Sequence, residues 1–225
     1  MHELSIQSIQ ERRSASEFVV WSESILDQAG ASDESWRAFF LRNECWKAFR
    51  DETLPLREFL LAPEIPEPNE IQQVLSDNAF DAIAWYGEET RYIEVTAALD
   101  VDDHHRDKIF LRDHRVNMTG TIEKTSEDGK KLARVKECSD ARENARREIR
   151  LVVDSIRRKS SKVPPPNTDL VVWIPVATRY TPNHWASTLL SNLVAEELQR
   201  TLLPYARLYV IGNERQLFYR DLSEH

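Results

Sequence analysis

The feature that most restricts the fold is a run of prolines between the strongest helical pattern and the most apolar segment of the chain. From Ser139 to Lys162, small and aliphatic residues recur at helical spacing, with arginines on the other faces. The segment VPPPNT cannot continue this helix, and DLVVWIPVA behind it has the nearly continuous apolar character of a strand buried inside a sheet. A further helix over 185–205 and two strands, 206–212 and 216–222, are expected to follow. This order predicts an α/β protein whose central mixed sheet is flanked by helices.

The first sixty residues favour helices. Phe18, Trp21 and Ile25 fall at helical spacing before Gly30, which is placed to end a helix. Aromatic residues then repeat at similar spacing from Trp36 onward, until the pattern breaks at Pro55. We therefore expect a helical N-terminal extension over residues 1–62 and an α/β domain over residues 63–225.

The α/β domain is expected to open with a short helix and a hairpin. Asn69 suits the N-cap of a helix in EIQQVLSD, directly after the proline-rich connector APEIPEPNE. Two apolar runs, 80–87 and 90–99, are joined by Gly-Glu-Glu, which is turn chemistry at hairpin length. The segment VNMTGTIEKT reads as a further extended stretch, after residues that could close a helix. The hairpin carries Asp81 and Glu94, two carboxylates in otherwise apolar surroundings.

Charge is distributed unevenly along the chain. The formal net charge of −8 disfavours a protein that coats nucleic acid nonspecifically, because that mode needs many Lys and Arg contacts to phosphate. Residues 130–162 nevertheless carry twelve Lys or Arg against five Asp or Glu, whereas residues 63–103 carry eleven acids and one base. An acidic segment and a basic helix favour a metal site beside a phosphate-binding surface, and two solvated faces of opposite sign are the alternative.

The chain is expected to be cytoplasmic and not associated with a membrane. Cys45 and Cys138 lie far apart and have no partners at metal-ligand spacing, which fits buried thiols in a reducing compartment. No apolar run approaches the length needed to cross a bilayer, and the first residues lack the apolar core of a secretory signal. A protein partner or a homodimer, formed through a terminal strand such as QLFYRDL, stays open as an alternative.

From residue 69 to about 175 the chain resembles the PD-(D/E)xK nuclease superfamily, which has the restriction-endonuclease-like fold. The order helix, three strands, helix, strand is similar to the αβββαβ core of that superfamily. Asp81, in FD, resembles its first metal-binding Asp, and IEVT, at 93–96, resembles the strand that carries its (D/E)xK motif. Glu70 matches a further acid that many members use, and the IRRKSSK helix end before a buried strand is also similar.

The chemistry of such a site can be stated from the residues alone. Mg²⁺ or Mn²⁺ takes oxygen ligands, usually one or two carboxylates together with water and substrate phosphate. Asp81 and Glu94 could share one ion if their side chains point to the same face, with the main-chain carbonyl of Val95 as a third oxygen. The ion would polarise the scissile phosphate and lower the pKa of an attacking water. The resemblance implies hydrolysis of a phosphodiester in nucleic acid, with DNA as the favoured substrate.

One residue departs from the superfamily motif. Thr96 stands where the motif has a lysine that positions or activates the nucleophile, and Thr cannot supply a positive charge. A base could come from elsewhere, with Lys124, Lys108 and Arg147 as candidates. The alternative is a catalytically inactive nuclease-like fold that serves as a protein- or nucleic-acid-binding module.

Each candidate residue also has a structural interpretation. Asp81 could cap a turn or pair with Arg91 across the hairpin, and Glu94 could lie on a solvated face. Glu70, in the first turn of its expected helix, would be favoured there by the helix dipole. The basic helix is expected to contact phosphate through three arginines, with a solvated helix face as the alternative: Arg146, Arg147 and Arg150.

Overall fold

The computed structural model describes residues 4–75, 79–99, 121–127, 130–136, 141–175, 184–212 and 215–223. Its helices are α1 (Ile6–Ile9), α2 (Ala15–Gly30), α3 (Asp33–Leu41), α4 (Cys45–Ala48), the π-helical turn η1 (Phe49–Thr53), α5 (Leu54–Leu61), α7 (Ala141–Lys159) and α8 (His184–Arg200). Its strands are β1 (Arg13–Ser14), β2 (Glu70–Gln73), β3 (Ala82–Tyr86), β4 (Glu89–Ala97), β5 (Thr121–Glu127), β6 (Lys130–Lys136), β7 (Thr168–Trp173), β8 (Arg207–Gly212) and β9 (Arg215–Asp221). The α/β class, with a mixed sheet and flanking helices, is confirmed.

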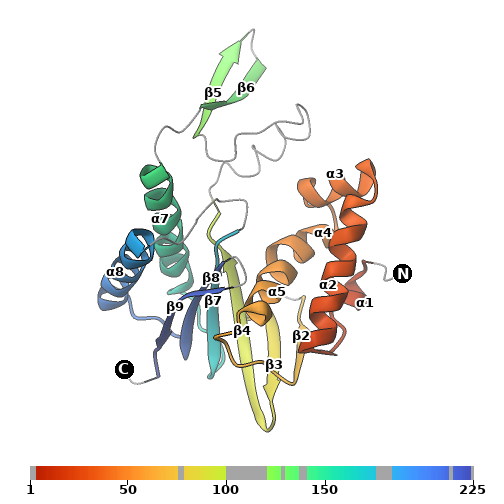
Figure 1. Ribbon diagram of the computed structural model, residues 1–225, viewed down its shortest axis with the longest axis vertical. Helices are drawn as coiled ribbons and strands as arrows, with labels where there is room; N and C mark the ends of the chain where they lie inside the picture. The colour runs from red at the N-terminus through yellow and green to blue at the C-terminus, as the bar shows by residue number, and fades with distance from the viewer. Residues whose placement is uncertain are drawn as a thin grey trace.

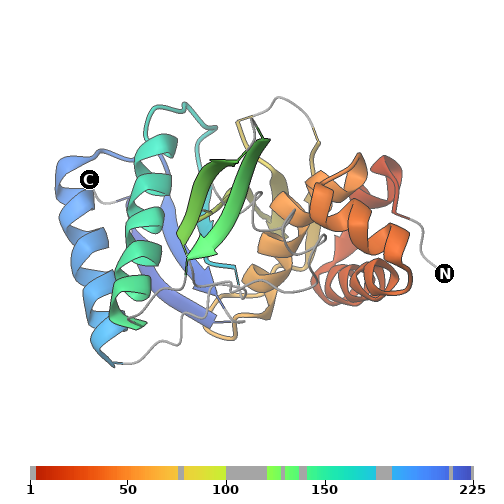
Figure 2. The ribbon, with the colours of Figure 1, turned by 90° about the horizontal axis from the view of Figure 1, so that it is seen from above.

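A seven-stranded sheet runs through the molecule in the order β1-β2-β3-β4-β7-β8-β9. The pairs from β1 to β4 are antiparallel, β4, β7 and β8 are parallel neighbours, and β9 closes the sheet in antiparallel fashion. The helices α2 to α5 lie on one side of this sheet and α7 and α8 on the other (Figures 1 and 2). The strands β5 and β6 form a separate two-stranded sheet.

The two faces of the sheet have separate hydrophobic cores. On the first face, Phe18, Trp21 and Phe59 from α2 and α5 pack in one cluster with Ile93 and Val171 from the sheet. On the second face, residues of α7 and α8 pack against alternate residues of β7 and β8. Since side chains alternate along a strand, each strand residue can be assigned to one face. The division at residue 62 stays a prediction, although α5 packs against the sheet.

Local sequence signals set several element boundaries. Ser14 caps α2 in a capping box with Glu17, and the helix ends at Gly30 as predicted. The helical pattern was expected to break at Pro55, but the chain stays helical through it, because α4, η1 and α5 follow one another without a gap and the wider π-helical turn η1 lies just before the proline. Gly87, with φ of 65°, makes the tight turn of the predicted β3–β4 hairpin.

The helix predicted for EIQQVLSD is wrong, because residues 70–73 form the strand β2. Asn69 does not cap a helix; its side-chain oxygen accepts a hydrogen bond of 2.6 Å from the amide of Gly87. The strand pairs with β1 on one edge and β3 on the other, and Ile71 and Gln73 are buried against the N-terminal helices. Tertiary pairing therefore overrides the weak helical signal of four polar and aliphatic residues.

One property of the helices bears on the prediction that the chain is not associated with a membrane. Within the described ranges, no helix is both long enough and apolar enough to span a bilayer.

Candidate functional site

Asp81, directly before β3, lies close to Glu94 of the neighbouring strand β4. The amide of Asp81 donates to the carbonyl of Ile93 at 2.8 Å, although Ile93 is also the register partner of Ala82. Asp81 Oδ2 accepts a hydrogen bond of 2.7 Å from the main-chain amide of Val95. The fold therefore brings the two predicted metal-binding carboxylates together. The role of the Val95 carbonyl stays a prediction.

Glu94 is completely buried, yet it does not face an apolar core. Its Oε1 accepts hydrogen bonds from the ammonium groups of Lys159 and Lys162, the latter at 2.6 Å. Its Oε2 is buried and has no hydrogen-bond partner among the described residues. An unsatisfied carboxylate oxygen in a protein interior is costly, so this atom is placed to receive a cation or a donor from a ligand.

Both lysines come from the C-terminal end of α7. Lys159 is the last residue of this helix, and its carbonyl accepts hydrogen bonds from the Lys162 amide and the Tyr205 hydroxyl. Partial burial tends to lower the pKa of Lys162, but the hydrogen bond and attraction to Glu94 outweigh it and raise the pKa above 10.5. Lys162 is therefore a cation at neutral pH. Both lysines bring positive charge to Glu94, and the sequence analysis names neither of them as a candidate base.

Asp81 is affected by the same crowding of charge. Burial, and then the nearby charge of Glu94, raise the pKa of Asp81 from 3.8 to about 6. The hydrogen bond from Val95 and the two lysines act in the opposite direction. Asp81 is thus mostly ionised above pH 7 but takes up a proton in mildly acidic solution.

A third acid, Glu52, was missed by the sequence reasoning. It lies on η1, and its Oε2 accepts a hydrogen bond of 2.9 Å from the side-chain amide of Gln73. The side-chain oxygen of Gln73 in turn accepts a hydrogen bond from the hydroxyl of Thr53. Burial, and then the charge of Asp81, raise the pKa of Glu52 to about 7. A single π-helical turn often marks a functional site. The only sequence signal was the polar stretch RDET before Pro55.

Glu70 is not brought to this site. It lies on β2 opposite Trp85, and Trp85 is four residues along β3 from Asp81, a separation of about 13 Å. Its carboxylate forms an ion pair with Arg12, with about half of each side chain exposed to solvent. The position of Glu70 favours a surface ion pair over a shared ligand role.

Two of the candidate bases cannot be placed at the site. Lys124 lies on β5, but its side chain is outside the described residues, as is the whole of Lys108. Arg147 lies on α7, and its Nε is buried without a hydrogen-bond partner among the described residues. Among the described residues, Lys159 and Lys162 bring positive charge to Glu94.

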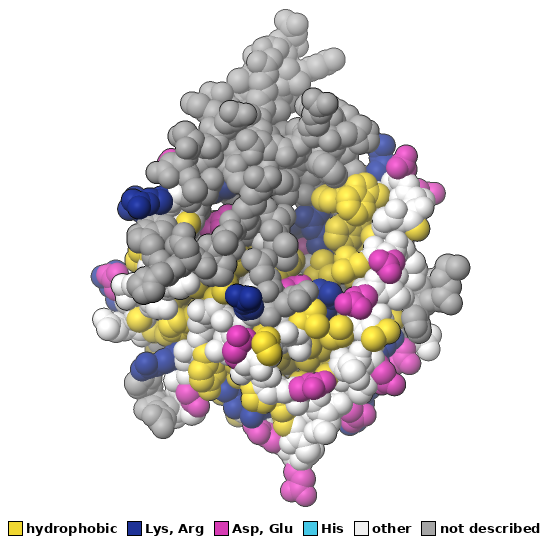
Figure 3. All heavy atoms as spheres, viewed as in Figure 1, with side chains coloured by type: hydrophobic (Ala, Val, Ile, Leu, Met, Phe, Trp, Pro, Cys, Tyr) yellow, Lys and Arg dark blue, Asp and Glu magenta, His cyan; other side chains and the backbone are white. Residues whose placement is uncertain are grey.

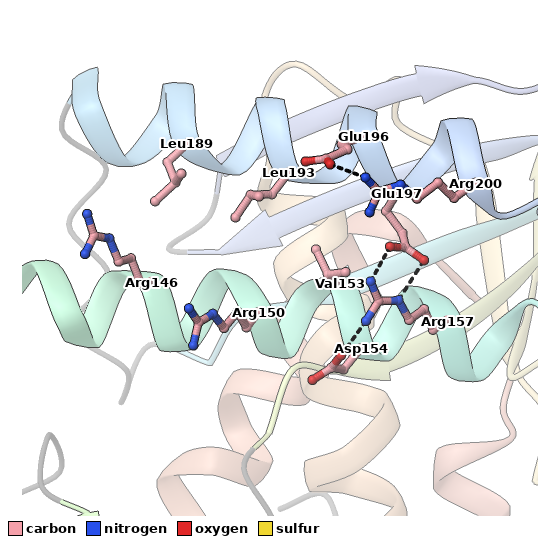
Figure 4. A pocket seen from close by; sticks show the side chains of 10 residues that line it. All are labelled: Arg146, Arg150, Val153, Asp154, Arg157, Leu189, Leu193, Glu196, Glu197 and Arg200. Atoms are coloured by element: carbon pink, nitrogen blue, oxygen red, sulfur yellow. Dashed lines mark hydrogen bonds and ion pairs between the residues drawn. The ribbon is translucent and has the colours of Figure 1, made fainter.

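Arg146 and Arg150 line a groove between α7 and α8, together with Leu189 and Leu193 (Figure 4). At the other end of this groove, Arg157 forms two hydrogen bonds with Glu197, at 2.8 and 2.6 Å. Arg150 precedes Lys159 by nine residues, about two and a half helical turns, so the two side chains leave α7 on opposite sides. The arginine groove and the carboxylate pair are separate surfaces.

In the described ranges, no three His, Cys, Asp or Glu side chains form a group with metal-binding geometry. A two-carboxylate site is nevertheless a common arrangement for Mg²⁺, which keeps several water ligands. Glu94 Oε2, which has no hydrogen-bond partner among the described residues, is an oxygen donor of the type that such an ion takes.

Comparison of the chain with protein-family models, with curated proteins and with solved structures found no match.

Proposed function

We propose that this protein is a divalent-metal-dependent nuclease that hydrolyses phosphodiester bonds, with DNA as the favoured substrate. The observation that carries the proposal is the side-by-side placement of Asp81 and Glu94, with two lysines from α7 on Glu94. The strand and helix order around this pair also supports the resemblance to the restriction-endonuclease-like core.

Different side chains of the protein would have different roles in the proposed hydrolysis. Asp81 and Glu94 would hold Mg²⁺ or Mn²⁺, and the bound ion would polarise the scissile phosphate and activate water. Lys162 stays protonated, so it suits the stabilisation of developing negative charge on phosphate better than proton abstraction. Glu52, with a pKa of about 7, supplies a carboxylate that can exchange a proton near neutrality.

The dispersed charge of the described surface favours recognition of the nucleic acid at a local site over binding to an extended basic surface. On the face seen in Figure 3, acidic side chains are scattered among basic and polar ones over the described surface. With a net charge of −8, the long-range field repels a polyanion. Productive binding would therefore depend on the lysines beside Glu94 and on contacts that do not rely on net charge.

The test is cleavage of single- and double-stranded DNA and RNA by the native chain in Mg²⁺, Mn²⁺ or EDTA, beside Glu94→Gln. We expect metal-dependent cleavage that falls by about 100-fold or more in Glu94→Gln. Asp169→Asn is a matched control, because Asp169 is an equally buried, ion-paired carboxylate on the next strand. Absence of cleavage by the native chain on every substrate, or equal losses in both variants, would overturn the proposal.

A further inference from the structure

A row of aromatic and aliphatic side chains lies on the same sheet face as Glu94. On β3, Ala82 and Ala84 are fully buried on the face covered by the N-terminal helices, so Ile83 and Trp85 project from the opposite face. Ile83 is paired with Tyr92 of β4, and Tyr92 precedes Glu94 by two residues. Phe80, directly before Asp81, places its ring centre 4.6 Å from that of Tyr92.

These four residues, Phe80, Ile83, Trp85 and Tyr92, form what we call the aromatic platform. Each is partly exposed, and none belongs to either hydrophobic core. The apolar residues of α7 and α8 pack instead against β7 and β8. Three of the four are aromatic, and their partial exposure outside both cores leaves ring surface that a ligand can contact.

Cations lie at both ends of the aromatic platform. The Arg12 guanidinium lies 3.9 Å from the ring centre of Trp85, at the end remote from the carboxylates. At the near end, Lys162 contacts Glu94 while 41% of its side chain remains exposed. This combination of flat apolar rings and cations matches a nucleic-acid strand better than an apolar protein segment, since a strand presents bases and phosphates together.

We propose that the aromatic platform stacks the unpaired bases of a single-stranded nucleic acid whose phosphodiester lies at Asp81 and Glu94. This inference rests on the proposed nuclease function and narrows its substrate class. Bases in a duplex already stack on each other and have no free face for a ring, whereas each unpaired base has one. Trp85 is two residues beyond Ile83, about 7 Å further along the strand, so the row is long enough for more than one base.

The direct test is fluorescence anisotropy in EDTA with a labelled mixed-sequence 20-nucleotide DNA, presented as a single strand and as a duplex. We expect the native chain to bind the single strand about tenfold or more tightly than the duplex, and Trp85→Ala to weaken single-strand binding by about tenfold. Trp85→Phe, which keeps a ring, should bind within about threefold of the native chain. Trp36→Ala is the matched control, since Trp36 is a partly exposed tryptophan on α3.

Outcomes of this test are separable from those for cleavage. Equal binding of single strand and duplex would overturn the proposed role of the aromatic platform, even if the protein cuts nucleic acid. An unchanged affinity in Trp85→Ala would do the same, provided that the circular dichroism of the variant is native. Binding that depends on Trp85 in a chain that never cuts would support the platform and reject the nuclease. Failure to bind any single strand would overturn the platform and favour a protein occupant for this face.

Discussion

Two buried carboxylates on adjacent strands, Glu94 on β4 and Asp169 on β7, make an instructive pair. Both are fully buried, both accept hydrogen bonds from cations, and both have one oxygen without a hydrogen-bond partner among the described residues. They lie on opposite faces of the sheet, Glu94 towards α7 and Asp169 towards the N-terminal helices. The two carboxylates differ in the charged groups that lie next to them.

Around Asp169 the charges are matched and fixed on the sheet. Arg207 donates to Asp169 at 2.6 Å and to Asn167 at 2.6 Å, while Arg91 is held by Glu89. Around Glu94, two lysines at the end of α7 contact its carboxylate, and the nearby Asp81 interacts with Glu94 and with Glu52. Burial raises the pKa of Asp169 to about 6 even beside Arg207, so a raised pKa alone does not separate the sites. The neighbouring charge does, because after burial the main cause of the raised pKa of Asp81 is the negative charge of Glu94, whereas Arg207 lowers the pKa of Asp169.

The largest stability effect is expected at the matched pair. Arg207→Ala leaves Asp169 buried with its principal cation removed, which should cost about 3–5 kcal/mol. Lys159→Ala should cost less, about 1–3 kcal/mol, because Lys162 still contacts Glu94. Urea unfolding at pH 8 measures both values. A larger loss of stability in Lys159→Ala than in Arg207→Ala would contradict the comparison.

Removing the charge of Asp81 is expected to change the stability by a smaller amount and in the opposite direction. Its folded pKa of about 6 exceeds the ordinary 3.8, so the destabilising penalty for ionising Asp81 builds up as pH rises from about 4 to about 6, stays constant above that range and disappears below about pH 4. Asp81→Asn keeps a side-chain oxygen for the Val95 amide but carries no charge. We expect it to raise the free energy of unfolding by about 1–2 kcal/mol at pH 8 and by about a third of that at pH 4.5.

The control for that prediction is cleavage by the same variant. Asp81→Asn should be more stable at pH 8 yet lose metal-dependent activity, because a neutral amide is a weaker ligand than a carboxylate. A variant that is destabilised at pH 8, or stabilised equally at both pH values, would show that the charge of Asp81 is well compensated in the native protein.

Glu70→Gln should have the smallest effect. The Arg12–Glu70 ion pair is exposed, so its loss should change stability by less than about 1 kcal/mol. Cleavage should be unchanged, because Glu70 is remote from Asp81 and Glu94. A large loss of activity with native stability would return Glu70 to the candidate site.

The sequence was most informative where local signals and the apolar pattern agree. Gly87 and the alternating residues around it predict the hairpin, and that hairpin brings Asp81 close to β4 beside Glu94. The prolines after Lys162 predict the end of α7 and the beginning of a buried strand. Both features depend on neighbours in the chain, which is why they could be read in advance.

The missed residues depend on packing between distant segments. Lys159 and Lys162 are visible in IRRKSSK, but nothing in that segment shows that the end of α7 lies over β4. Glu52 reaches the site through one π-helical turn and the long-range partner Gln73. Glu70 was misplaced because EIQQ is too short for its period to distinguish a helix from a strand.

Direct metal binding tests the central claim. Isothermal titration of the native chain with Mn²⁺ at pH 7.5, repeated for Glu94→Gln and Asp169→Asn, compares the two buried carboxylates in one experiment. We expect one Mn²⁺ to bind to the native chain and to Asp169→Asn, and no binding to Glu94→Gln. Binding that survives in Glu94→Gln, or that is lost only in Asp169→Asn, would contradict the assignment of the metal to Asp81 and Glu94.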